Sequence, residues 1–208
     1  MLTGDRVLTP RSQMKRQQIL DAATKLFIQH GYAITMDSIA VAANVSKQTV
    51  YAHFKTKDEL FDTCIRAKCM ESQCEHILLN DDRDTRTVLC GFAKRFQEIL
   101  LSEEAIVTYR TAIRQLDTHP DLAKVFVSAG PQTTITMLAE YLAAKQAQGE
   151  IAFSISAKDA AMQLLLMLHG RIVFLAQLGQ PCDMTSQENE AYIESCVDLF
   201  LNGYRVKK

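Results

Sequence analysis

Apolar residues recur with helical spacing along nearly the whole chain of 208 residues, and the sequence holds 8 Gly and 4 Pro. Positions three and four apart repeatedly carry Ile, Leu, Val, Ala or Phe, which is typical of amphipathic helices. No alternating apolar and polar run extends beyond a few residues, so strands are not expected. The pattern predicts an all-α protein of about nine helices.

The first helix is expected from about residue 12 to residue 30, with Ile19, Leu26 and Phe27 buried and Gly31 at its end. A helix over 125–148 would be kinked or split by Pro131 unless this proline lies in a first turn. The other helices are expected at about 36–43, 47–54, 56–78, 85–101, 103–116, 160–178 and 186–204.

Residues 35–57, TMDSIAVAANVSKQTVYAHFKTK, predict two short helices joined by a tight turn. Thr35 is placed to cap the first helix, Asn44 makes the turn, and Ser46 is placed to cap the second helix. Val50 and Phe54 lie four apart and would share one buried face. The start of the second helix is therefore exposed, as in a helix-turn-helix that enters the major groove of DNA.

The exposed side chains of this hairpin suit contacts with DNA. Lys47 suits the acceptors of guanine, Gln48 suits adenine, and the methyl group of Thr49 suits the methyl group of thymine. Which of the three touches a base is left open by the sequence. The expected DNA-binding residues, with those placed to meet phosphates, are Thr35, Lys47, Gln48, Thr49, Tyr51, His53 and Lys57.

The segment ILDAATKLFIQHGYAITMDSIAVAANVSKQTVYAHFKTKDELF, residues 19–61, resembles the N-terminal DNA-binding domain of TetR-type transcriptional regulators. Residues 109–150 are similar to the C-terminal domains of the AefR-like branch of that family. The resemblance implies a three-helix DNA-binding domain at residues 1–56. It also implies a helical bundle for ligand binding and dimerisation at residues 57–208.

The charge of the chain is unevenly distributed. Residues 1–60 hold eight Lys and Arg against five Asp and Glu, whereas the remaining residues hold 15 against 19. This imbalance supports the DNA-binding interpretation of the first part. Arg11, Lys15 and Arg16 are either an arm beside the DNA backbone or the solvated start of a helix, and the sequence leaves both open.

Several other classes of protein find no support. The six cysteines show no C-x-x-C pair and no spacing with His that suits zinc, so no metal, cofactor or catalytic site is expected. No nucleophile elbow or phosphate loop is present, which argues against an enzyme. The N-terminus lacks a signal-peptide core, and polar residues interrupt the apolar stretch 162–178. A cytoplasmic protein with reduced thiols and no membrane span is expected.

The C-terminal bundle is expected to hold a small-molecule effector, because the resembled family uses such a pocket. Arg110, Arg114 and His169 are candidates to anchor a polar group of the ligand, although each can equally be a paired or core residue. The expected pocket residues are Phe92, Phe96, Tyr109, Ile113, Met137, Tyr141, Met162, Leu166 and His169.

The last two predicted helices have wide apolar faces, which favour a homodimer that matches two half-sites of a palindromic operator. The hypothesis is a repressor that an effector releases from DNA, and activation remains an alternative. A second alternative is a redox sensor that uses Cys64, Cys69 or Cys74, although their five-residue spacing places them on different faces of a helix.

Overall fold

The computed structural model describes residues 9–71 and 83–206, and most of these residues lie in helices. Outside the helices, one isolated bridge joins Ile151 to Arg205. The elements are α1 (Pro10–His30), η1 (Gly31–Ala33), α2 (Met36–Ala42), α3 (Lys47–His53), α4 (Lys57–Glu71), α6 (Thr85–Leu101), α7 (Glu103–Arg114), α8 (Pro120–Ala129), α9 (Pro131–Ala147), α10 (Ala157–Gln177) and α11 (Ser186–Gly203).

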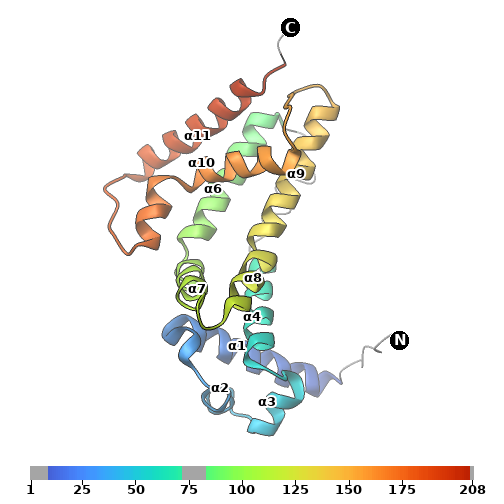
Figure 1. Cartoon of the computed structure of the whole chain (residues 1–208), viewed down its shortest axis with the longest axis vertical. Helices are drawn as coiled ribbons and strands as arrows, with labels where there is room; N and C mark the ends of the chain where they lie inside the picture. Colours follow the sequence, from blue (N-terminus) through green and yellow to red (C-terminus); the bar gives the residue numbers. More distant parts are fainter. Residues whose placement is uncertain (1–8, 72–82, 207–208) are drawn as a thin grey trace.

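The molecule is elongated, with α1, α2 and α3 at one end and α6, α9, α10 and α11 at the other (Figure 1). We call α1, α2 and α3 the reading head. The helices α4, α7 and α8 lie between the reading head and the far end (Figure 1). All-α architecture is confirmed.

The predicted local signals at the reading head are confirmed. Thr35 caps α2 in a capping box in which the Ser38 amide donates to Thr35 Oγ1 at 3.1 Å. Asn44 makes the turn with φ of 51°, a conformation that Asn tolerates better than most residues. Ser46 caps α3 by accepting from the Thr49 amide at 3.1 Å.

The apolar core of the reading head extends beyond α3. It contains Leu60 and Phe61 from α4 and Leu122 from α8, together with the buried faces of α1 and α2. The Phe61 ring packs edge-on against Phe27 and Tyr32, with ring centroids 4.8 Å and 5.4 Å away. Because α4 supplies part of this core, the proposed boundary after residue 56 falls inside a shared packing unit.

The second core joins α6, α9, α10 and α11 around Phe92, Leu138, Leu164 and Val197, all of which are fully buried. The helical stretch expected over 125–148 is divided, as Pro131 had indicated it could be. Gly130 separates α8 from α9, and Pro131 lies in the first turn of α9, where its missing N–H leaves no intrahelical bond unmade. Pro131 therefore starts a helix and does not kink one.

The helix α10 is broken at Gly170, whose φ of 56° and ψ of −178° are open to glycine and strained for other residues. By length and composition alone, α10 is apolar enough to cross a membrane. Core helices pass the same test, and Leu164 and Leu168 of α10 are fully buried within the second core. The composition of α10 therefore has an explanation in packing.

Candidate DNA-binding interface

The helix α3 presents a polar face because its apolar side chains are fully buried. Val50 and Phe54 have no exposed surface, and both belong to the core of the reading head. Lys47, Gln48 and Tyr51 are consequently exposed, and Thr49 is half-buried. This arrangement places three side chains at the start of α3 where base edges of a major groove could be reached.

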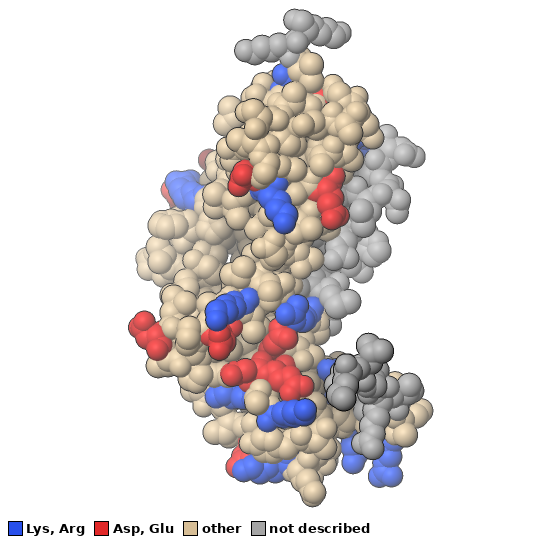
Figure 2. All heavy atoms as spheres, turned by 45° about the vertical axis from the view of Figure 1, so that its right-hand side comes forward, with Lys and Arg blue, Asp and Glu red and all other residues tan. Residues whose placement is uncertain are grey.

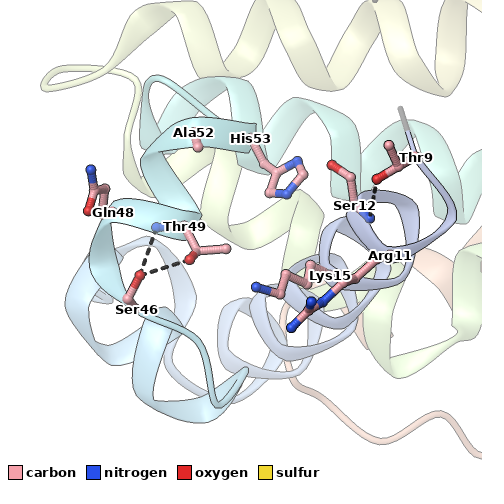
Figure 3. Close-up of a pocket in the computed structure, with 9 residues that line it drawn as sticks. All are labelled: Thr9, Arg11, Ser12, Lys15, Ser46, Gln48, Thr49, Ala52 and His53. Carbon is pink, nitrogen blue, oxygen red and sulfur yellow. Dashed lines mark hydrogen bonds between the residues drawn. The ribbon is translucent and has the colours of Figure 1, made fainter. Parts of the chain in front are cut away.

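A cleft of about 610 Å³ lies between the start of α1 and α3 (Figure 3). Arg11 and Lys15 extend into it from α1, while Gln48, Thr49 and His53 line it from α3 (Figure 3). Among the described residues, the full lining is Thr9, Arg11, Ser12, Lys15, Ser46, Gln48, Thr49, Ala52 and His53. This set contains basic and neutral side chains without an acid, so the cleft favours an anionic ligand such as a phosphate.

His53 is the titratable group of α3 whose environment opposes a positive charge. Partial burial and the nearby Arg16 and Lys15 lower the pKa of its imidazole below the usual value. Arg16 itself lies 4.9 Å from the centre of the Phe54 ring, a favourable cation–π arrangement. These effects favour the neutral imidazole of His53 in the free protein, and this form can donate one hydrogen bond to a phosphate without a charge of its own.

Lys47 forms an ion pair with Asp37 of α2, with Nζ and Oδ1 2.7 Å apart. The hydrogen bond to Asp37 raises the pKa of Lys47. Both side chains are about 60% exposed, and such surface pairs contribute little because water screens them. The pair can therefore open at small cost when Lys47 turns toward DNA.

Lys57 is turned toward the protein. Its Nζ donates to the carbonyls of Tyr32 and Ile34 at 2.9 Å and 3.1 Å, and lies 4.0 Å from the centre of the Tyr32 ring. Burial lowers the pKa of this ammonium group. Lys57 thus fixes η1 to the start of α4, and its contact with a phosphate stays a prediction that would use the remaining N–H.

The cleft also contains two of the three basic residues that the sequence assigned either to an arm beside the DNA backbone or to the solvated start of a helix. Arg11 and Lys15 are four apart on α1 and face α3 across the cleft, whereas Arg16 packs on Phe54. The signal in the sequence was this four-residue spacing in the first turns of α1. Basic side chains also occupy the reading-head end on the face seen in Figure 2, with acidic side chains gathered above them.

The residues expected around an effector are brought together only in part. Phe92 and Met137 are buried in the second core, Phe96 stacks on Phe92, and Tyr141 packs against the same core. Tyr109 instead meets Phe126 of α8, at 6.1 Å between ring centroids.

The other four expected pocket residues lie elsewhere. Leu166 and Ile113 are exposed by 65% and 49%, Met162 is also exposed, and His169 contacts Gln177. A cavity of about 250 Å³ between α6 and α11 is lined by Lys94, Gln97, Glu98, Leu101, Ser186, Asn189, Glu190 and Ile193. It includes none of the expected residues.

The three cysteines of the redox alternative are only partly described. Cys64 is buried, and burial raises the pKa of its thiol to about 11, so it is protonated at neutral pH. The side chain of Cys69 and the whole of Cys74 lie outside the described residues. Within the described part of the chain, no group of His, Cys, Asp and Glu could hold a metal ion.

A capped second helix whose polar face lies beside a basic cleft defines a helix-turn-helix DNA-binding protein. Comparisons with known proteins give the same class. A profile of the tetR family of bacterial regulatory proteins matches residues 19–64, and a profile of the AefR-like transcriptional repressor C-terminal domain matches residues 87–206. The chain belongs to the TetR family of transcriptional regulators.

Individual relatives agree with this assignment. The uncharacterized regulator YhgD of Bacillus subtilis is 57% identical over 49 residues, which are 23% of this chain and 26% of YhgD. The structure of a TetR-family regulator from Mesorhizobium loti has a TM-score of 0.84 at 28% identity, covering 95% of this chain and all of that one. The Flavonoid-responsive Regulator FrrA has a TM-score of 0.82 at 30% identity, covering 94% and 100%.

Proposed function

We propose that this protein is a repressor that binds a palindromic operator as a homodimer and is released from it by a small-molecule effector. The observation that carries DNA binding is the basic cleft between α1 and α3, beside the exposed start of α3. Repression is supported by the match to the AefR-like repressor domain. Activation remains the second candidate, because the interface determines DNA binding and not its effect on transcription.

In this proposal the contacts divide by chemistry. Lys47, Gln48 and Thr49 read base edges, and the side chains around the cleft hold phosphates. Base contacts supply the preference for one sequence, whereas phosphate contacts set the position of the protein on the duplex. The remaining expected contacts with phosphates are Thr35, Tyr51, His53 and Lys57.

The homodimer would form through α10 and α11. Leu166 and Phe174 of α10, Leu178 directly after it and Leu199 of α11 are each more than half exposed. Exposed apolar side chains of this size on two neighbouring helices support a surface that a second copy covers. A two-fold dimer would then present two reading heads to half-sites about 34–36 Å apart.

The effector would bind among the apolar residues of the second core. Phe92, Phe96, Met137 and Tyr141 supply aromatic and thioether side chains to this core, which suit a flat apolar molecule better than a strongly charged one. The likeness to FrrA, which is described as flavonoid-responsive, makes flavonoids the first compounds to test. Binding would change the tilt of α4, which packs on both α1 and α8, and so move the reading head.

The decisive experiment is fluorescence anisotropy of the protein on the DNA upstream of its own gene, over a series of salt concentrations. Tight, salt-sensitive binding is expected. Lys15→Ala should weaken binding to all duplexes and lower the slope of log affinity against log salt by about 1. Lys25→Ala, which removes an exposed lysine from α1 away from the cleft, should leave the slope unchanged. Weak binding that is the same for the wild type, for both variants and for every duplex would contradict the proposal.

The effector step has its own measurement. A flavonoid that binds should raise the melting temperature of the protein and displace it from the labelled duplex at the same concentrations. Compounds that raise the melting temperature without displacing the protein would show ligand binding without regulation. If no compound in a broader apolar library displaces the protein, the ligand-responsive part of the proposal fails while DNA binding stands.

A further inference from the structure

The last two turns of α10, residues 171–177, form a separate helical half after the break at Gly170. In Figure 1 this half runs in a different direction from the first half of α10. The break frees carbonyl groups that side chains of neighbouring helices satisfy. Gln97 Nε2 donates to the Leu168 carbonyl at 2.7 Å, and the Tyr192 hydroxyl donates to the Met167 carbonyl at 2.8 Å. The break is therefore built into the packing of α6 and α11.

The other end of this helical half is held by Arg110 of α7. Arg110 Nε donates to the Gln177 carbonyl at 2.8 Å, and Nη2 donates to the Ala176 carbonyl at 2.6 Å. Carbonyls of a last helical turn lack intrahelical partners, and a cation there also complements the helix dipole. The guanidinium group thus supplies both hydrogen-bond donors for the last carbonyls and a positive charge at the C-terminal end of this short helix.

The same helix α7 contacts the reading head. It packs against α1 and η1, and a Cβ placed on Gly31 would lie 3.6 Å from the hydroxyl of Thr111, the residue after Arg110. Just beyond α7, the ring of His119 meets the ring of Tyr32, with centroids 5.1 Å apart. One rigid helix therefore touches η1 and holds the end of α10.

We infer that Arg110 is a positioning residue that couples the end of α10 to the reading head. This inference rests on the proposed function as a dimeric repressor. Arg110 holds residues 171–177 against α7, so that Phe174 and Leu178, exposed by 56% and 60%, are fixed in place for a second copy of this chain. A change in that contact then moves α7 and η1 together. Subunit contact and operator binding are linked through this side chain.

The test uses full-length protein and two variants of Arg110, with Arg114→Gln as the matched control. Arg114 is exposed, lies one turn further along α7, and loses the same charge. Hydrogen–deuterium exchange is measured over residues 171–180 and 31–36, and the dimer dissociation constant by sedimentation equilibrium. Anisotropy on the operator completes the set, and thermal unfolding confirms that each variant folds.

Arg110→Gln should speed exchange at both segments and raise the dimer dissociation constant about tenfold or more, because charge-assisted hydrogen bonds are lost. Arg110→Gln should also lower operator affinity. Arg110→Lys keeps a hydrogen-bond donor and the charge, so each of these changes should be smaller in this variant. Arg114→Gln should change none of them. Faster exchange at 171–180 with an unchanged reading head and an unchanged dimer would overturn the coupling.

The arms of this test separate the inference from the proposed function. A wild-type protein that binds no operator would refute the proposed function. Hydrogen–deuterium exchange and the dimer dissociation constant would still test the role of Arg110. A wild-type protein that is monomeric at all concentrations would refute both the proposed homodimer and the inference, whereas a wild-type dimer that binds the operator, with a dissociation constant and a reading head unchanged by Arg110→Gln, would refute the inference alone.

Discussion

Gln48 and Lys15 face the same cleft from opposite helices, yet their chemistry differs. A carboxamide can pair with one base through two hydrogen bonds, whereas an ammonium group attracts any phosphate. Gln48 is therefore expected to affect the preference for one DNA sequence, whereas Lys15 is expected to affect the affinity for any DNA.

Gln48→Ala should relax the sequence preference of the protein at one position of each half-site. Loss of a paired base contact costs about 1–3 kcal/mol of discrimination against the wrong base, while affinity for unrelated DNA stays nearly constant. Selection from a pool of random duplexes, compared between the wild type and the variant, measures this directly. An unchanged selected sequence would show that Gln48 contacts no base.

The buried thiol of Cys64 should make stability depend on pH at the alkaline end. Its pKa is raised from about 9 to about 11 in the folded protein, so the unfolded chain loses the proton first. The free energy of unfolding therefore falls as the pH rises from 9 to 11, by about 2 kcal/mol from this group. Urea unfolding of the wild type and Cys64→Ala, under reducing conditions at pH 8 and pH 10.5, measures how much the free energy of unfolding of each protein falls between the two pH values. An equal fall in the two proteins would contradict this account of the thiol.

Local chemistry made some residues predictable and others not. Thr35 and Ser46 cap their helices through atoms three residues away, so the sequence alone indicated both caps. The inward turn of Lys57 depends on the carbonyls of Tyr32 and Ile34, more than twenty residues earlier in the chain. A contact of that kind has no periodic signature.

At the scale of elements, helix existence followed from apolar spacing, while helix interruptions did not. Pro131 indicated a kink, a split or a helix start, and only packing decided between them. The break in α10 had a weaker signal, a single glycine within an apolar run. Its cause lies in Gln97 and Tyr192, which satisfy the freed carbonyls from two other helices.

Gly170→Ala should destabilise the protein by about 1–3 kcal/mol, because alanine is strained at this positive φ. An added Cβ would also lie 2.7 Å from Cε1 of Tyr192. Gly203→Ala is the matched control, since a Cβ there meets nothing within 4 Å. Thermal unfolding of both variants checks the expectation, and equal melting temperatures would show that the break is not required.

At the scale of the whole molecule, Leu166→Glu should produce a monomer and weaken operator binding. Leu166 is 65% exposed on the first half of α10, so a carboxylate there is harmless to the monomer and costly inside a dimer. Val127→Glu provides a control with the same charge at an exposed position of α8. Sedimentation equilibrium measures the association, and two variants with the same oligomeric state would rule out this surface.

The packing of α4 and α8 under the reading head limits how the protein can be recombined with its relatives. A chimera joined at residue 56 would place a foreign reading head on Leu60, Phe61 and Leu122, side chains shaped for another partner. Such hybrids should express poorly even when both parents are stable, because the mismatch lies inside a filled core. A new operator specificity is better introduced by replacing the few exposed residues of α3 and leaving the scaffold intact.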